Sequence, residues 1–355
     1  MYAQKLKSEK QKFTFNCWQW LGLAAGLFLG VAALFAWQAW SSYKTFLASA
    51  GLDDQQLLEL WARSRERELP QTDGRINALL LGTDILEYRD ASTPLTDTMM
   101  LTSLDLSAGK LYLLPLARDT FWAAGNVKLN SIYASFYHRN PETAREEMRK
   151  FMSEATGIPL HYVAVINLYD VRDFIDLIGG VEVDVEQSFT DYQYPRDDVD
   201  INKVFDPALL YETVSFEAGP THLDGDLALK FMRSRHAQNN EGSDFARSRR
   251  QQKVISAVVE KVSRKLREQL LAYDLSFLGQ LYQFYEQRFE NQIPFVDGLA
   301  LLQQMLSWGH LPEVVQNELS VDVPGGSLQE NKKDFTLRIT SLAAWRQDIR
   351  GKLGM

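Results

Sequence analysis

The chain has 355 residues, of which 45% are hydrophobic and 24% charged, so it can form one large globular domain or two smaller ones. A net charge of −8 excludes a global positive field for nucleic acid, and any anion must bind at a local basic cluster. The single cysteine, Cys17, excludes an intrachain disulfide and a thiolate metal cluster, and the five histidines lack the spacing of zinc ligands.

The N-terminal region has the features of a membrane anchor. No charged residue occurs between Lys12 and Lys44, and residues 17–40 are almost all apolar, which exceeds the roughly 20 residues that a spanning helix needs. Tryptophans lie near both ends, and four lysines precede the segment, so the positive-inside rule places the N-terminus in the cytoplasm. We therefore predict a cytoplasmic tail at 1–12, a transmembrane anchor at 13–43 and an extracytoplasmic remainder. The alternative is a cleaved signal peptide, but residues 36–40 do not resemble a small-residue cleavage site.

After the anchor, residues 44–75 are predicted to form a linker helix, and from Ile76 short apolar runs alternate with amphipathic stretches. Residues 187–216 are polar and aromatic, and we expect an irregular excursion over the surface. A last strand is expected at 319–323. The expected strands before it are 78–81, 98–106, 110–116, 161–167 and 181–185, and the expected helices are 141–154, 168–177, 224–230, 244–269, 275–290 and 297–307.

Alternating strands and helices in one continuous stretch favour an α/β fold with a central mixed β-sheet sandwiched by helices. We assign this domain to residues 76–326 and a C-terminal tail to residues 327–355.

Two carboxylates follow or abut predicted strands. Asp84 and Asp97 lie thirteen residues apart, with hydroxyls beside them at Thr83 and Thr98. Hard oxygen ligands of this kind suit magnesium. Aspartates also cap turns through backbone hydrogen bonds, and on spacing alone that alternative is the stronger.

Basic residues recur at several places where predicted elements begin or end. Arginine suits phosphate because its planar guanidinium can donate two parallel hydrogen bonds. A solvated helix face would explain Arg249, but it would not explain the recurrence in an acidic protein. The recurring basic residues favour phosphate or pyrophosphate binding, and Arg247 shares a helix face with Gln251. They are Arg118, Arg233, Arg235, Arg247, Arg249 and Arg250.

Seven motifs in this order resemble the LytR–CpsA–Psr family. They are LLLGTD, TDTMMLTSLD, PLARDT, KLNSIYAS, VAVINLYDVRDFIDLIGGVEVDV, HLDGDLALKFMRSRH and SDFARSRRQQ, and they span about residues 76–326. The resemblance implies an α/β/α fold with an apolar tunnel for a lipid tail. It also implies a Mg²⁺-dependent phosphotransferase that moves a glycopolymer from a polyprenyl-diphosphate lipid to peptidoglycan at the cytoplasmic membrane.

Residue by residue, the resemblance implies that Asp84 and Asp97 hold magnesium and that Arg118 contacts the phosphates, all three being catalytic. Arg233 with Arg235, and Arg247 with Gln251, match the diphosphate-binding pairs, and the role of Arg250 is left open. For the tail pocket we expect apolar residues behind the site, with ordinary core as the alternative. These are the strand 163–166 and, on the long helix, Val254, Ile255 and Val258.

The sequence departs from the family at the position two residues before the second aspartate. The family has an arginine there and this chain has Leu95, for which Arg89 is a possible substitute. Two other functions therefore stay open: a non-catalytic polyprenyl-phosphate-binding regulator or scaffold, and a polyprenyl-diphosphate pyrophosphatase.

Overall fold

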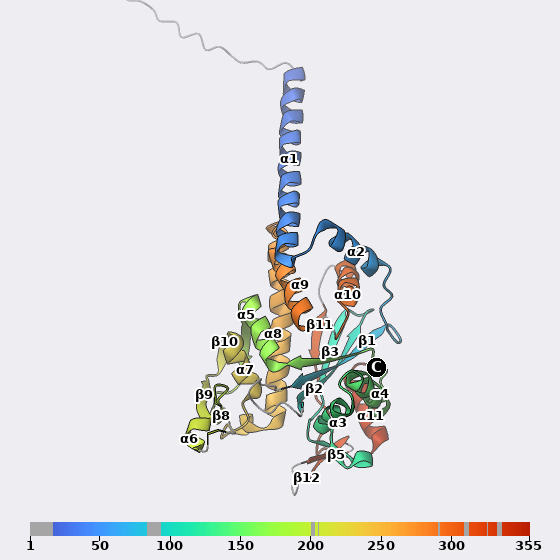
Figure 1. Ribbon diagram of the computed structural model, residues 1–355, viewed down its shortest axis with the longest axis vertical. Helices are drawn as coiled ribbons and strands as arrows, with labels where there is room; N and C mark the ends of the chain where they lie inside the picture. The colour runs from blue at the N-terminus through green and yellow to red at the C-terminus, as the bar shows by residue number, and fades with distance from the viewer. Residues whose placement is uncertain are drawn as a thin grey trace, which may run out of the picture.

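In the computed structural model, the residues described are 17–83, 94–199, 203–204, 206–289, 292–308, 312–324, 326–331 and 336–355. A long helix, α1 (Cys17–Ala50), stands out from an α/β body (Figure 1). Its segment Ala24–Ala50 is long and apolar enough to cross a membrane, which fits a single-pass anchor. The helix continues past the predicted boundary at residue 43, because Ser42, Leu47 and Ala50 are buried against the body.

The linker region holds a second, separate helix, α2 (Asp54–Arg65). Gly51, with φ of +65°, ends α1, and a capping box between Asp53 and Gln56 starts α2. The single linker helix expected at 44–75 is therefore wrong in its extent, since its first seven residues belong to α1.

The central sheet has the strand order β11-β3-β2-β1-β6. β1 pairs antiparallel with β2 and parallel with β6, while β3 pairs antiparallel with β2 and parallel with β11, so the sheet is mixed as predicted. The five strands are β1 (Arg75–Thr83), β2 (Thr96–Asp105), β3 (Lys110–Pro115), β6 (Tyr162–Asn167) and β11 (Glu313–Gln316).

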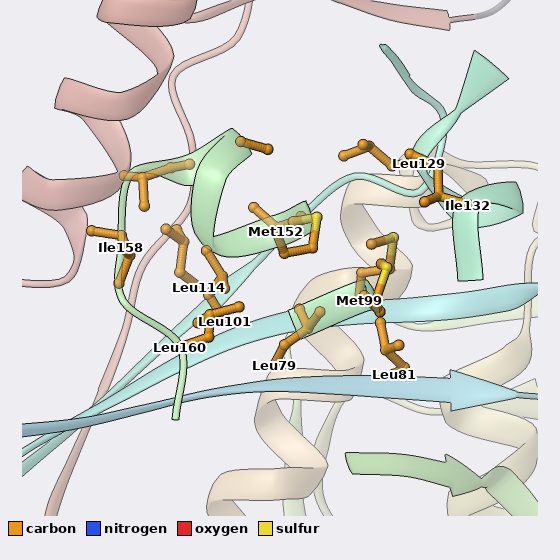
Figure 2. Packing of buried hydrophobic residues seen from close by; sticks show 14 of the residues in the cluster. Leu79, Leu81, Met99, Leu101, Leu114, Leu129, Ile132, Met152, Ile158 and Leu160 are labelled. Carbon is orange, nitrogen blue, oxygen red and sulfur yellow. The ribbon is translucent and has the colours of Figure 1, made fainter. Parts of the chain in front are cut away.

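One face of this sheet is covered by α3 (Ile132–Arg139), α4 (Ala144–Thr156) and α11 (Leu342–Lys352). Leu79 and Leu81 point to the same face because strand side chains alternate. Figure 2 shows them packed with methionines and leucines of β2, β3 and α4 in a fully buried cluster. This cluster is the larger of the two cores in the part of the chain that the structure describes.

The second core lies between α8 (Asp244–Leu271), α7 (Gly225–Arg233) and α5 (Leu168–Ile178) and two small sheets. Helices thus flank the sheet on both sides, which confirms the α/β fold predicted from the sequence. The small sheets pair β7 (Val181–Val185) with β10 (Gly219–Leu223), and β8 (Phe189–Pro195) with β9 (Tyr211–Phe216).

The strands β8 and β9 overturn the expectation of irregular structure at 187–216. Their apolar positions, Phe189, Tyr194, Val214 and Phe216, are buried in the second core. A short helix, α6 (Pro207–Leu210), lies between the two strands.

The C-terminal region also differs from the prediction. The expected strand at 319–323 is wrong: the edge strand β11 comes earlier, and Val321 makes only an isolated bridge with Leu328. Residues 327–355 carry β12 (Leu328–Asn331), β13 (Thr336–Ile339) and α11, whose Trp345 is fully buried. β13 pairs with β4 (Thr120–Trp122), and β4 pairs with β5 (Val127–Lys128).

Two further helices tie the N-terminal helices to the body. α9 (Ser276–Arg288) packs along the end of α1, and α10 (Phe295–Trp308) packs against α2. In Figure 1 both lie at the end of the body from which α1 emerges.

Candidate functional site

The end of β1 and the start of β2 meet at one edge of the central sheet. Gly82 lies opposite Thr98, and a Cβ on this glycine would come within 2.8 Å of the Cβ of Thr98, so the two backbones can approach only without a side chain here. Asp97 lies beside this contact and is partly exposed. Asp84 and Arg89 lie outside the described residues, so the predicted acidic pair is represented here by Asp97 alone.

Arg118 lies after β3 at the same edge. Its Nη1 donates to Oδ1 of Asp97, and its Nε lies 3.3 Å from Oδ2 of Asp119. Lys128 Nζ lies 2.6 Å from the other oxygen of Asp119. Two carboxylates thus hold two cations at the end of the sheet, and Arg118 keeps a fixed orientation beside Asp97.

Arg233 and Arg235 come at the end of α7. Arg233 Nη1 donates to the hydroxyl of Tyr194 at 3.0 Å and to Asp197 at 2.9 Å. The backbone N–H groups of Arg235 and His236 donate to one oxygen of Asp191, at 2.9 and 3.2 Å.

Asp191 is fully buried and was missed by sequence reasoning. It stands at an inward-facing position of β8, where a strand pattern would place an apolar residue. Its acceptor oxygens fix the loop that carries Arg235. An aspartate at an inward position of a strand is the signal that could have identified Asp191. That signal could not be recognised because residues 187–216 were predicted to be irregular and not a strand.

The first turns of α8 carry Arg247, Arg250 and Gln251, all buried. Arg250 donates to the carbonyls of Phe231 and Ser234 at the end of α7, and to the carbonyl and carboxylate of Glu241. Burial lowers the pKa of Arg250. The role of Arg250, left open by the sequence, is therefore to clamp α7 to α8.

The predicted residues line two adjoining pockets. The first, of about 280 Å³, is lined by Arg118 and the second, of about 110 Å³, by Arg233 and Arg235. Both are lined by Asp97, Arg247 and Gln251. All the predicted site residues within the described part of the chain therefore converge on one cleft at the sheet edge. The first pocket also has an apolar wall, made of Met99, Leu116, Leu319, Val321, Leu328 and Leu337.

The apolar residues proposed from the sequence for the lipid tail lie elsewhere. Val163 is buried in the sheet core and Val254 in the second core, and neither lines the two pockets. These two residues are therefore part of the ordinary hydrophobic core, which was the alternative to a tail pocket. The apolar wall comes instead from Met99 of β2, from Leu116 after β3, and from Leu319, Val321, Leu328 and Leu337. Of the last four, two lie in the strand expected at 319–323 and two in the expected C-terminal tail, so none was proposed from the sequence.

The donor atoms near Asp97 are oxygens. Thr98 Oγ1 is buried and has no hydrogen-bond partner among the residues that the structure describes. Within the same residues, no group of three or more His, Cys, Asp or Glu side chains could hold a metal ion. Magnesium typically takes only one or two carboxylates and completes its shell with water and substrate phosphates. Asp97 and Thr98 both line the first pocket and offer oxygen atoms of the kind that a magnesium arriving with a diphosphate accepts.

The chain is similar in sequence to a known protein family and to several of its members. The family model described as the LytR_cpsA_psr family matches residues 45–311. The polyisoprenyl-teichoic acid–peptidoglycan teichoic acid transferase TagU of Bacillus mycoides is 26% identical over 187 residues, 52% of this chain and 52% of that protein. The enzyme of the same name from Enterococcus faecalis is 24% identical over 243 residues, 68% of this chain and 69% of that protein.

TagV of Bacillus subtilis, named as a transferase of the same kind, is 24% identical over 214 residues, 59% of this chain and 47% of that protein. The chain thus spans about half the length of the Bacillus mycoides and Bacillus subtilis relatives. The crystal structure of Bacillus subtilis TagT gives a TM-score of 0.51 at 18% identity and covers 82% of this chain and 96% of that one, which shows a shared fold. The resemblance carried by the seven motifs is confirmed, and because the family model matches well over half of the sequence, the chain belongs to the LytR_cpsA_psr family.

Proposed function

We propose that the chain is a membrane-anchored phosphotransferase that moves a glycopolymer from a polyprenyl-diphosphate carrier to peptidoglycan. The observation that carries this proposal is the convergence of Arg118, Arg233, Arg235, Arg247 and Gln251 on one cleft with an apolar wall. A lipid diphosphate combines the two chemistries that this cleft offers. The names of the relatives, which are teichoic acid transferases, support the same reaction class.

The reaction follows from the charges. The acceptor hydroxyl attacks the phosphorus that carries the glycopolymer, the bridging P–O bond breaks, and polyprenyl phosphate leaves. Negative charge grows on the leaving oxygen, and guanidiniums already fixed around the cleft stabilise that charge more in the transition state than in the ground state. The ion pair with Asp97 fixes the direction of Arg118 before the substrate arrives.

The proton of the acceptor hydroxyl passes to a carboxylate of the chain, for which Asp84 is our proposal from the sequence. Asp97, Thr98 Oγ1 and Asp84 would hold magnesium, which neutralises charge on the phosphates when bound. The apolar wall of Leu116 and Leu337 would contact the first part of the polyprenyl tail and exclude water from the cleft.

We also propose the orientation in which the N-terminus is cytoplasmic and the domain extracytoplasmic, on the strength of the four lysines that precede α1. The donor would then come from the outer leaflet of the membrane and the acceptor from the wall.

The test uses the full-length protein in detergent with a lipid-linked donor, Mg²⁺ and peptidoglycan fragments, and measures released polyprenyl phosphate. Arg118→Ala should lower turnover about 10²–10³-fold, as the loss of a preorganised charge donor does. Arg249→Ala is the matched control, because that side chain is 39% exposed and lines neither pocket. Absence of transfer with the wild-type protein would refute the proposal, and phosphate release without acceptor would indicate a pyrophosphatase.

A second candidate, a non-catalytic lipid-phosphate binder, is favoured by one observation. Leu95, at the position where the resemblance implies an arginine, is 45% exposed and lies two residues from Asp97. Leu95→Arg should raise turnover by up to about tenfold, the effect of one added charge-assisted hydrogen bond. Donor binding without turnover in both proteins would support the binder instead.

A further inference from the structure

A set of exposed apolar side chains surrounds the foot of α1. In the turn between α8 and α9, Leu271 is 76% exposed and Tyr273 is 44% exposed. On α2, Leu58 is 67% exposed, and Trp61 is exposed three residues further along the same side of the helix. We call these four residues the membrane-facing surface.

The contacts of α1 place both parts of this surface at the same height. Ser42 Oγ donates to the carbonyl of Tyr273, and the ring of Tyr273 lies 6.2 Å from that of Phe35. On another side, Lys44 Nζ lies 3.3 Å from Asp54 at the start of α2. Residues 42–44 are where the uncharged stretch of α1 ends, so the turn and α2 flank the end of the apolar segment (Figure 1).

The backbone presents these residues outward. Tyr273 has φ of +54°, a left-handed conformation that few non-glycine residues adopt, and it reverses the chain between α8 and α9. Beside it, Leu271 ends α8 without burial. On α2, the stripe of Leu57, Leu60 and Ser64 faces the body, and Ser64 receives a hydrogen bond of 2.8 Å from Gln303 of α10, while Leu58 and Trp61 are exposed outside that stripe.

We propose that the membrane-facing surface inserts into the interfacial layer of the same bilayer that α1 crosses. The proposal rests on α1 as a membrane span, which is part of the proposed function. Leucine favours the hydrocarbon boundary, and tyrosine and tryptophan favour the headgroup layer. All four residues of the membrane-facing surface are uncharged, so the attachment is apolar and does not depend on anionic lipid.

The consequence is a fixed orientation of the domain. A domain attached by a single helix can change its orientation relative to the membrane. A domain attached at α1, α2 and the α8–α9 turn has three contact points, which restrict that orientation. The site at the far end of α8 is then kept at a constant height above the bilayer.

The experiment labels single cysteines with an environment-sensitive fluorophore in the full-length Cys17→Ser protein, reconstituted in phosphatidylcholine vesicles with lipid-bound nitroxides. Leu271→Cys and Leu58→Cys should be quenched by the lipid nitroxide at least about threefold more than by a water-soluble quencher, as for residues within the interface. Val323→Cys should show the reverse preference, because Val323 is exposed and lines a hollow with Leu328 and Gln329 of β12, which Figure 1 shows at the opposite end of the body. Replacing part of the phosphatidylcholine by phosphatidylglycerol should change neither result.

The contrary outcomes are separable. Leu271→Cys that is as accessible to the water-soluble quencher as Val323→Cys overturns the membrane-facing surface. Val31→Cys, within the apolar segment of α1, reports the span itself: its quenching by lipid nitroxide, together with an unquenched Leu271→Cys, leaves the anchor standing and removes only this inference. An unquenched Val31→Cys overturns both the span and the surface.

Discussion

Neighbouring polar residues at the start of α8 have different roles because their side chains end in different places. Gln251 lines both pockets of the cleft, whereas Gln252 turns to the sheet and donates to the carbonyls of Leu113 at 3.2 Å and Asn317 at 2.9 Å. Both side chains are buried, so burial alone does not separate the binding residue from the structural one.

The pair therefore offers a matched test. Gln252→Ala removes the side-chain donor from the half-buried carbonyl of Asn317 and from the buried carbonyl of Leu113, which keeps the N–H of Asn317. We expect the free energy of unfolding to fall by about 1–2 kcal/mol. Gln251→Ala removes one longer hydrogen bond, of 3.4 Å to the carbonyl of Met232, and should lower turnover with a smaller change in the free energy of unfolding. Urea denaturation and the transfer assay measure the two effects, and equal losses of stability in both variants would contradict the division of roles.

His161 gives the stability of the domain a pH dependence. Burial lowers the pKa of His161, whose Nδ1 accepts a hydrogen bond of 2.9 Å from the N–H of Asn77. The unfolded chain takes up a proton near pH 6.5, the ordinary value for histidine, and the folded chain only at lower pH. Since the unfolded state then binds more protons, stability is complete above about pH 6.5 and is lost as the pH falls through the folded pKa.

Replacing His161 with Gln should reduce the fall in the free energy of unfolding below about pH 6.5. The measurement is the free energy of unfolding at several values between pH 7.5 and pH 5, for wild type and variant. A variant whose stability falls with the wild-type slope would show that other groups carry the effect.

At the scale of elements, the sequence predicted best where one periodicity ran without interruption. The hairpin of β2 and β3 and the helices α5 and α8 lie within a few residues of their predicted positions, because each has a regular apolar pattern and a clear turn or cap. β8 and β9 were missed because their inward positions are spread among polar residues and the paired strands are far apart in the chain.

The site residues, like the elements, could be predicted where the signal was local in the sequence. Arginines and glutamine at element ends could be proposed from chemistry and resemblance, and they converge on the cleft. Asp191 and the wall formed by Leu328 and Leu337 could not, since their contribution depends on contacts between segments distant in sequence. These two leucines belong to β12 and β13, which pair with each other, while β13 also pairs with β4 and the N–H of Leu337 donates to the carbonyl of Asp119 at 3.1 Å.

The helix α11 shows how much the C-terminal residues contribute. Trp345 is fully buried in the sheet core, and Arg346 donates to the carbonyls of Glu154 and Ala155 at the end of α4. Trp345→Ala should lower the free energy of unfolding by about 3–5 kcal/mol, the usual cost of removing a buried tryptophan. Leu342→Ala, on an exposed residue of the same helix, should change it little. Thermal unfolding compares them, and a Trp345→Ala protein as stable as wild type would place α11 outside the core.

At the scale of the whole molecule, the cleft and the foot of α1 lie at opposite ends of α8. Gln251 and Leu271 are twenty residues apart on α8, which corresponds to about 30 Å at 1.5 Å per residue. Figure 1 shows α8 running from the foot of α1 toward the far end of the body. In the proposed function a lipid-linked donor spans this height, so the angle between α1 and the body would bear directly on turnover at a membrane.

That angle depends on the contact between α1 and α9. A Cβ on Gly279 would lie 1.9 Å from Ser49 Oγ and 2.7 Å from the backbone N of Ala50, so only glycine permits the observed packing. Gly279→Val should push the end of α1 away from α9 and reorient the body on the membrane. We expect turnover of a donor embedded in vesicles to fall about tenfold or more, because small misplacements of reacting groups are costly.

The same variant should retain its turnover, within about twofold, when enzyme and donor share detergent micelles, since the cleft itself is untouched and only the membrane geometry is lost. Gly298→Ala on α10 is the matched control, because a Cβ at that position meets no atom within 4 Å. It should behave as wild type in both settings. An equal loss for Gly279→Val in vesicles and in micelles would mean that the substitution damages the fold, and no loss in either would mean that the packing of α1 on α9 does not set the reach of the site.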